Sequence, residues 1–117
     1  MGEFKKMIDP KKIEQALVDF KACSKIFLAL GDSTRQKICL DLAAAGTEGI
    51  NVADLSGKTI LSRPAISHHL KVLKDAGIVE PIKQGTQIFY KLRLKDYFIP
   101  MKALMETIEE ILSEEES

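Results

Sequence analysis

Side chains that commonly carry out chemistry are few in this chain: two cysteines, Cys23 and Cys39, and two adjacent histidines, His68 and His69. Thiols and imidazoles are the usual ligands of transition metals, but a closed site needs about four of them together. Ser67 and His68 do not form a nucleophile and its base, because neighbouring helical residues point about 100° apart. We therefore expect that the protein is not an enzyme and that it has neither a metal site nor a cofactor.

A second group of side chains has the types that recognise DNA. Across residues 62–74, apolar residues recur at steps of four and three, which predicts a helix with one buried face. Arginine can pair bidentately with guanine, serine can contact bases or phosphates, and lysine neutralises phosphate. The buried stripe is Ile66, Leu70 and Leu73, and the polar candidates for DNA contact are Ser62, Arg63, Ser67, His68 and Lys71.

The charge is distributed unevenly, although 17 basic and 17 acidic residues give a net charge of zero. Residues 58–93 contain seven Lys or Arg against only Asp75 and Glu80, a balance of +5. Residues 105–117 contain six Glu and no Lys or Arg, a balance of −6. A basic segment beside an acidic one favours a phosphate-binding surface more than the total charge does.

Length and composition favour one soluble domain. A chain of 117 residues with 45% hydrophobic and 29% charged residues can bury a single core. Two cysteines are too few for a disulfide framework, so we expect a reduced, cytoplasmic protein. Apolar runs fall short of a membrane span, and residues 1–12 lack the apolar segment of a secretory signal.

Start and stop signals predict five helices and one hairpin. A period-two segment over 79–92 turns at Gln84-Gly85-Thr86, and Pro81 marks its first strand as an edge strand. The last helix begins at about Asp96 or Ile99. The other helices are expected over 9–30, 33–45, 52–56 and 63–76, with caps at Asp9, Asp32 or Ser33, Asn51 and Ser62.

Two tightly joined helices followed by a two-stranded ribbon predict a winged helix-turn-helix. The fold class is mainly α with a small β-hairpin wing (α+β), in which residues 31–94 form the DNA-binding core of a single domain. A helix fits the major groove, and its first residues meet the base edges. The wing tip carries four more candidates for backbone or minor-groove contact: Lys83, Gln84, Thr86 and Gln87.

Two stretches resemble the ArsR/SmtB family of bacterial repressors. They are Leu30–Arg35, which reads L-G-D-S-T-R, and Ser62–Val79, which contains S-H-H-L-K-V-L-K-D-A-G. The resemblance covers roughly residues 27–93 and includes the wing, with Ser33 in place of the usual Pro. It implies a homodimeric transcriptional repressor that binds an operator in double-stranded DNA and leaves it when an effector binds.

The metal sites usual in that family are not matched by the residues here. The thiol site, Cys-x-Cys, falls on Val52-Ala53-Asp54, which contains no sulfur. The site on the last helix starts from Asp96 and continues to positions that hold Phe98, Glu109 and Leu112. We therefore expect a repressor without the usual metal sites, released by an unknown effector.

Cys39 keeps a thiol-based alternative open, because some relatives sense sulfide or oxidants with one cysteine on the second helix and another on the last helix. Cys39 lies on the second predicted helix, but the last helix has no cysteine. A buried thiol that packs as a small hydrophobe is the simpler interpretation for both cysteines. We expect a structural hydrogen bond for His69, and either a structural ion pair or a contact with phosphate for Arg35.

The first and last helices carry apolar surface beyond what a three-helix core needs. Mutual burial across a twofold axis would cover it, which predicts a homodimer and a pseudo-palindromic operator with half-sites about one turn apart. A winged helix that binds another protein is a remote alternative. Its recognition face would be apolar, whereas the face predicted here is polar. The expected dimer residues are Ile13, Leu17, Phe20, Met101, Leu104, Met105, Ile108 and Leu112.

Overall fold

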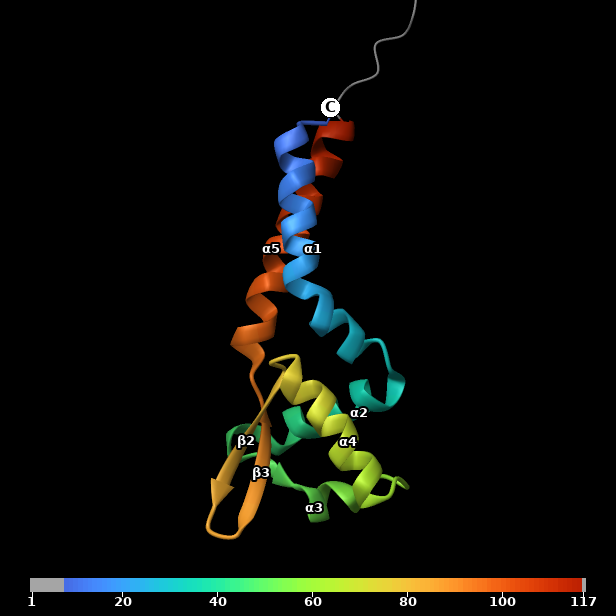
Figure 1. Ribbon diagram of the computed structural model, residues 1–117, viewed down its shortest axis with the longest axis vertical. Coiled ribbons are helices and arrows are strands. Elements are labelled where there is room, and N and C mark those ends of the chain that lie inside the picture. The colour runs from blue at the N-terminus through green and yellow to red at the C-terminus, as the bar shows by residue number, and fades with distance from the viewer. Residues whose placement is uncertain (1–7, 117) are drawn as a thin grey trace, which may run out of the picture. The chain divides into compact units, whose positions relative to one another are not determined.

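The structure is a computed structural model that describes residues 8–116. Part of the segment on which the expectation about a secretory signal rests, residues 1–7, lies outside the described residues. No helix in the described range is long and apolar enough to span a bilayer. The elements are α1 (Pro10–Leu30), α2 (Ser33–Ala45), the 3-10 turn η1 (Gly46–Glu48), β1 (Ile50–Asn51), α3 (Val52–Ser56), α4 (Arg63–Asp75), β2 (Val79–Gln84), β3 (Gln87–Leu92) and α5 (Leu94–Glu116) (Figure 1).

The first four α-helices begin where their capping residues predict. Asp9 accepts a hydrogen bond from the Lys11 N–H at 2.9 Å, so α1 starts at Pro10. Such caps satisfy backbone N–H groups that have no partner within the helix. The other three caps bond in the same way: Asp32 to Arg35 N at 3.0 Å, Asn51 to Asp54 N at 2.8 Å, and Ser62 to Ala65 N at 3.3 Å.

The predicted hairpin is confirmed, and the sheet has one more strand than expected. Gln84 pairs with Gln87 around a two-residue turn in which Gly85 has a φ of 63°, as such turns require. The strand order is β1-β3-β2, so Pro81 does lie on an edge strand. The two residues of β1 pair with Tyr90 and Phe89 of β3, a strand too short to show any alternation in the sequence.

The described chain forms two compact units, which we consider separately. One is Lys25–Tyr97, which contains the helix-turn-helix and the wing, and the other joins the residues up to Ser24 with those from Phe98 onward. In Lys25–Tyr97 the predicted stripe of α4 is fully buried. Its buried apolar partners include Ile38 and Leu42 of α2, Leu55 of α3, and Ile78 and Val79 at the start of the wing.

The second unit, which we call the helix pair, consists of α1 packed beside α5. Thr107 Oγ1 donates to Asp19 Oδ2 at 2.6 Å, and Lys12 Nζ lies 3.0 Å from Glu114 Oε1. Its buried apolar residues are Ala16, Cys23 and Leu104. The last helix starts at Leu94, earlier than predicted, because Asp96 lies within the first turn and pairs with Arg93 rather than capping a helix.

Candidate nucleic-acid interface

The outward face of α4 is polar and open. Because Ile66, Leu70 and Leu73 are buried, the opposite face of the helix points away from the core. The hydroxyl of Ser62 accepts the capping bond with its oxygen, and its own O–H is still able to donate to a phosphate. The structure exposes all five predicted residues of this helix: Ser62, Arg63, Ser67, His68 and Lys71.

The wing tip is equally open, and it is tied to the neighbouring strand. All four predicted residues, Lys83, Gln84, Thr86 and Gln87, are exposed. Asn51 Nδ2 donates to Gln87 Oε1 at 3.2 Å, which links the start of β3 to the residue that caps α3. The polar side chains of the tip therefore lie on a hairpin that this hydrogen bond connects to the start of α3.

A surface hollow of about 390 Å³ brings the helix and the wing together. Ser67 of α4 lines it from one side, and Thr86 and Gln87 line it from the wing. Val52 and Ala53, the first residues of α3, also line it. Within this unit, the wing tip, α3 and the amino-terminal end of α4 lie at the same end (Figure 1). Two residue sets that are 12 to 25 positions apart in sequence thus share one surface.

Ion pairs sort the seven basic residues of 58–93 into two groups. Lys91 lies 3.9 Å from Glu80 across the hairpin, and Arg93 pairs with Asp96. Within the part of the chain that the structure describes, no ion pair engages the other five: Lys58, Arg63, Lys71, Lys74 and Lys83. The unpaired cations lie on α4, on the turn before it and near the wing tip, where a polyanion would be met.

Arg35 is a structural residue that fastens three helices. Its Nε donates to the Ala29 carbonyl at 2.7 Å, and its Nη2 donates to the Leu28 carbonyl at 3.2 Å, both near the end of α1. Its Nη1 donates to Nδ1 of His69 on α4 at 3.3 Å, so the structural bond predicted for His69 is present. The Arg35 backbone N–H also holds the pKa of Asp32 below its usual value.

Metal ligands do not gather in the described structure. Among residues 8–116, no three His, Cys, Asp or Glu side chains lie close enough to hold an ion. Asp96, the position at which the family's last-helix site would start, is paired with Arg93. Both cysteines are free, and burial raises the pKa of the Cys39 thiol to about 11, which keeps it protonated near neutral pH.

The expected dimer residues fall into three groups by exposure. Ile13, Leu17 and Phe20 on α1 and Met105 and Leu112 on α5 are each about half exposed, between 48% and 57%. Met101 and Ile108 are half-buried. Leu104 is only 1% exposed, because it fills the core between α1 and α5, so we place it in the interior of one chain rather than on an open face. Sequence reasoning left out three other exposed apolar residues of the pair: Val18, Phe98 and Ile99.

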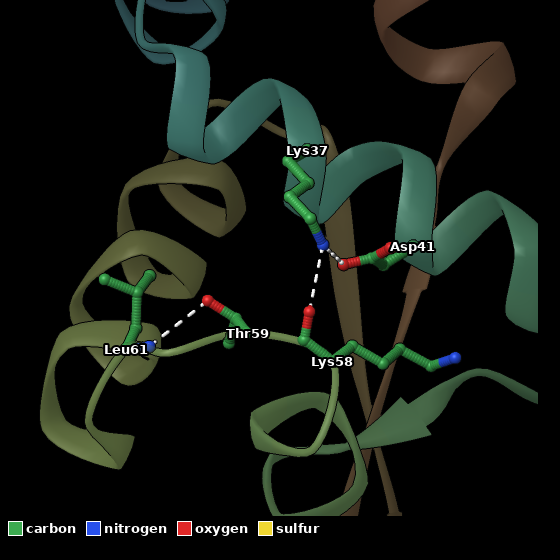
Figure 2. Close-up of polar contacts among 5 residues, drawn as sticks. All are labelled: Lys37, Asp41, Lys58, Thr59 and Leu61. Atoms are coloured by element: carbon green, nitrogen blue, oxygen red, sulfur yellow. Dashed lines mark hydrogen bonds and ion pairs between the residues drawn. The ribbon is translucent and has the colours of Figure 1, made fainter.

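A further feature that was not singled out in the sequence is the segment 57–62 between α3 and α4, which we call the extended turn. Figure 2 shows Lys37 of α2 reaching it: Lys37 Nζ donates to the Lys58 carbonyl at 3.1 Å and pairs with Asp41 at 2.9 Å. Within the turn, the Leu61 N–H donates to Thr59 Oγ1 at 3.2 Å. The only sign of this turn in the sequence is the number of residues between the predicted end of the helix at 52–56 and the predicted cap Ser62.

Comparison with known proteins gives consistent matches. The profile of bacterial regulatory proteins of the arsR family matches residues 32–81. The transcriptional repressor SdpR of Bacillus subtilis (strain 168) is 38% identical over 69 residues, which is 59% of this chain and 73% of the relative. An uncharacterized HTH-type transcriptional regulator of Methanocaldococcus jannaschii is 41% identical over 71 residues, 61% of this chain and 78% of the relative. An ArsR-like transcriptional regulator from Rhodococcus sp. RHA1 superposes with a TM-score of 0.70 at 28% identity, covering 80% of this chain and 84% of the other.

Proposed function

Because this chain belongs to the ArsR family of bacterial regulatory proteins, and is a DNA-binding repressor of transcription rather than an enzyme, we propose that it works as a homodimer on a pseudo-palindromic operator. The observation that carries the proposal is the shared surface of α4 and the wing, where nine polar or basic side chains are exposed. In this proposal residues 31–94 read DNA, and the helices at 9–30 and 96–117 hold two chains together.

Each part of the surface has a distinct role in the proposed complex. Arg63, at the amino-terminal end of α4, pairs with a guanine in the major groove, and Ser67 and His68 contact neighbouring bases or phosphates. Lys71 neutralises a phosphate. The wing tip follows the backbone into the adjacent minor groove with Lys83, Gln84, Thr86 and Gln87.

The exposed apolar side chains of α1 and α5 support the homodimer. Burying a large apolar side chain contributes about 1.5–3 kcal/mol, so a twofold contact through these helices has a strong driving force. A twofold dimer presents two copies of α4, which bind half-sites about one helical turn apart. The residues proposed for this contact are Ile13, Leu17, Phe20, Met101, Met105, Ile108 and Leu112.

We propose that the effector is not a transition metal bound at the usual family positions. The support comes from the residues: Val52–Asp54 contain no sulfur, and Asp96 is paired with Arg93. Thiol sensing by Cys39 is disfavoured, because a thiol whose pKa is raised to about 11 has little thiolate at neutral pH. A protein-binding role for α4 is disfavoured by its polar face.

Titration of the purified chain against the DNA upstream of its own gene tests the proposal, with fluorescence anisotropy as the readout. We expect affinity to fall steeply with salt, because each neutralised phosphate releases counterions. Arg63→Ala should weaken specific binding by about 10-fold or more, and Lys71→Ala should lower the salt slope by about one. Lys25→Ala, which removes the same charge beside the opposite end of α4, is the matched control. A flat salt response would count decisively against DNA binding.

A further inference from the structure

The extended turn is longer than the turn of an ordinary helix-turn-helix. α3 ends at Ser56 and α4 begins at Arg63, so six residues separate the two helices. About three to four residues join them in the general motif. The additional length carries Ile60, whose exposed fraction of 104% is the largest among the exposed apolar side chains of the described chain. Ile60 therefore adds nothing to the core of one chain.

The shape of the extended turn is held from two sides. Lys37 of α2 binds the Lys58 carbonyl at 3.1 Å, and the Thr59 hydroxyl accepts the Leu61 N–H at 3.2 Å (Figure 2). The Thr59 N–H in turn donates to the Ser56 carbonyl at 3.4 Å. These bonds keep the backbone on either side of Ile60 in place, so its side chain is presented at a defined position.

The charge of the extended turn suits a polyanion. It contains no acidic residue, and in the described range no ion pair engages the Lys58 ammonium. Lys37, in contrast, is neutralised by Asp41, so its part is to hold the backbone. The turn ends at Ser62, the cap of α4, and leads directly into Arg63, at the end of α4 that enters the major groove in the proposed complex.

We infer that the extended turn is a third DNA contact, in addition to α4 and the wing; this inference rests on the proposed function. Ile60 packs against an apolar part of the duplex, a thymine methyl or a deoxyribose at the border of the major groove. Lys58 Nζ neutralises a phosphate of the same strand. Lys37 is a positioning residue that keeps both side chains beside α4.

The test measures operator binding by two single variants, Ile60→Ser and Lys58→Ala, over a range of salt concentrations. Ile60→Ser should weaken binding about five- to tenfold with an unchanged salt slope, because it removes an apolar contact and no charge. Lys58→Ala should lower the slope of log K against log salt by about one. Both side chains are exposed, so the thermal unfolding of both variants should match that of the parent.

Lys25→Ala and Arg63→Ala in the same titration separate the possible failures. Turn variants that bind like Lys25→Ala, while Arg63→Ala binds weakly, would overturn the inference and leave the proposed function standing. If Arg63→Ala also binds normally, the proposed function itself fails. Ile60→Ser that binds DNA normally but changes the sedimentation of the dimer would assign the turn to a contact between copies, and would equally overturn the DNA contact.

Discussion

The two compact units of this chain differ in the side chains that they bury and in those that they leave exposed. In Lys25–Tyr97, the buried residues that the structure describes are all apolar, and they come from helices α1 to α4, from β1 and from the start of the wing. In the helix pair, Asp19 and Thr107 are buried and bonded to each other. The helix pair is the smaller unit, yet it holds eight of the thirteen exposed large apolar side chains of the described residues.

This contrast separates a unit that closes its core within one chain from a unit that we propose to be half of a dimer interface. The DNA-reading unit closes its own core. Its stability therefore depends on side chains such as Leu70, which are buried within one chain. The helix pair leaves apolar side chains exposed, and in the proposed dimer a second chain covers them. Each prediction below tests one side of this division.

The largest effect is expected in the closed core. Leu70→Ala removes a side chain that is 0% exposed at the centre of α4, which should lower the free energy of unfolding by about 2–5 kcal/mol. Urea denaturation followed by circular dichroism measures it. Leu40→Ala removes the same atoms from a residue of α2 that is 71% exposed, and should change the free energy by less than about 0.5 kcal/mol. Equal losses in the two variants would contradict a core closed within one chain.

The open face should respond to charge instead. Leu17→Lys combined with Met105→Lys places two ammonium groups on surfaces that are 57% and 50% exposed in one chain. Neither substitution disturbs a buried side chain, but both charges must lose water in a dimer, so the dimer dissociation constant should rise at least about 100-fold. Sedimentation velocity measures it, and Leu40→Lys is the control. A double variant that still sediments as the parent would refute an interface on this face.

The buried polar pair should give a smaller loss. Thr107→Val keeps the shape of the side chain but removes the hydroxyl that donates to Asp19, so a buried carboxylate oxygen loses its partner. Leaving such a group unsatisfied costs about 1–3 kcal/mol, measurable by thermal or urea unfolding. Thr107→Ser retains the donor and should restore most of the stability. If the valine and serine variants are equally stable, the hydrogen bond does not stabilise the pair.

Local signals in the sequence were sufficient for most of the DNA-reading unit. Asp32, Asn51 and Ser62 cap their helices because a short polar side chain can reach a free N–H two or three residues ahead, whatever the rest of the chain does. The spacing of Ile66, Leu70 and Leu73 identified the buried face of α4 for a similar reason. The hairpin followed from its period and from Gly85.

Features that depend on contacts between distant residues could not be predicted in this way. β1 has two residues, and only its pairing with Tyr90 and Phe89 makes it a strand. Leu104 belongs to the same apolar stripe as Met105, and only the packing of α1 against α5 separates the buried residue from the exposed one. The bond from Lys37 to Lys58 crosses 21 positions and leaves no periodic trace in the sequence.

The smallest effect concerns the thiol of Cys39, and it tests whether the DNA-reading unit carries a reactive group. Burial raises the pKa of Cys39 from 9.0 to about 11, so the folded chain holds this proton more tightly than the unfolded chain between pH 9 and 11. Stability should therefore fall as the pH rises through that window, and Cys39→Ser should remove this part of the decline. In the folded chain, alkylation of Cys39 by iodoacetamide, resolved by peptide mass spectrometry, should be slow at pH 7 and should increase up to about pH 11. Rapid alkylation at pH 7 would instead reveal a thiolate and restore thiol sensing as a function of this unit.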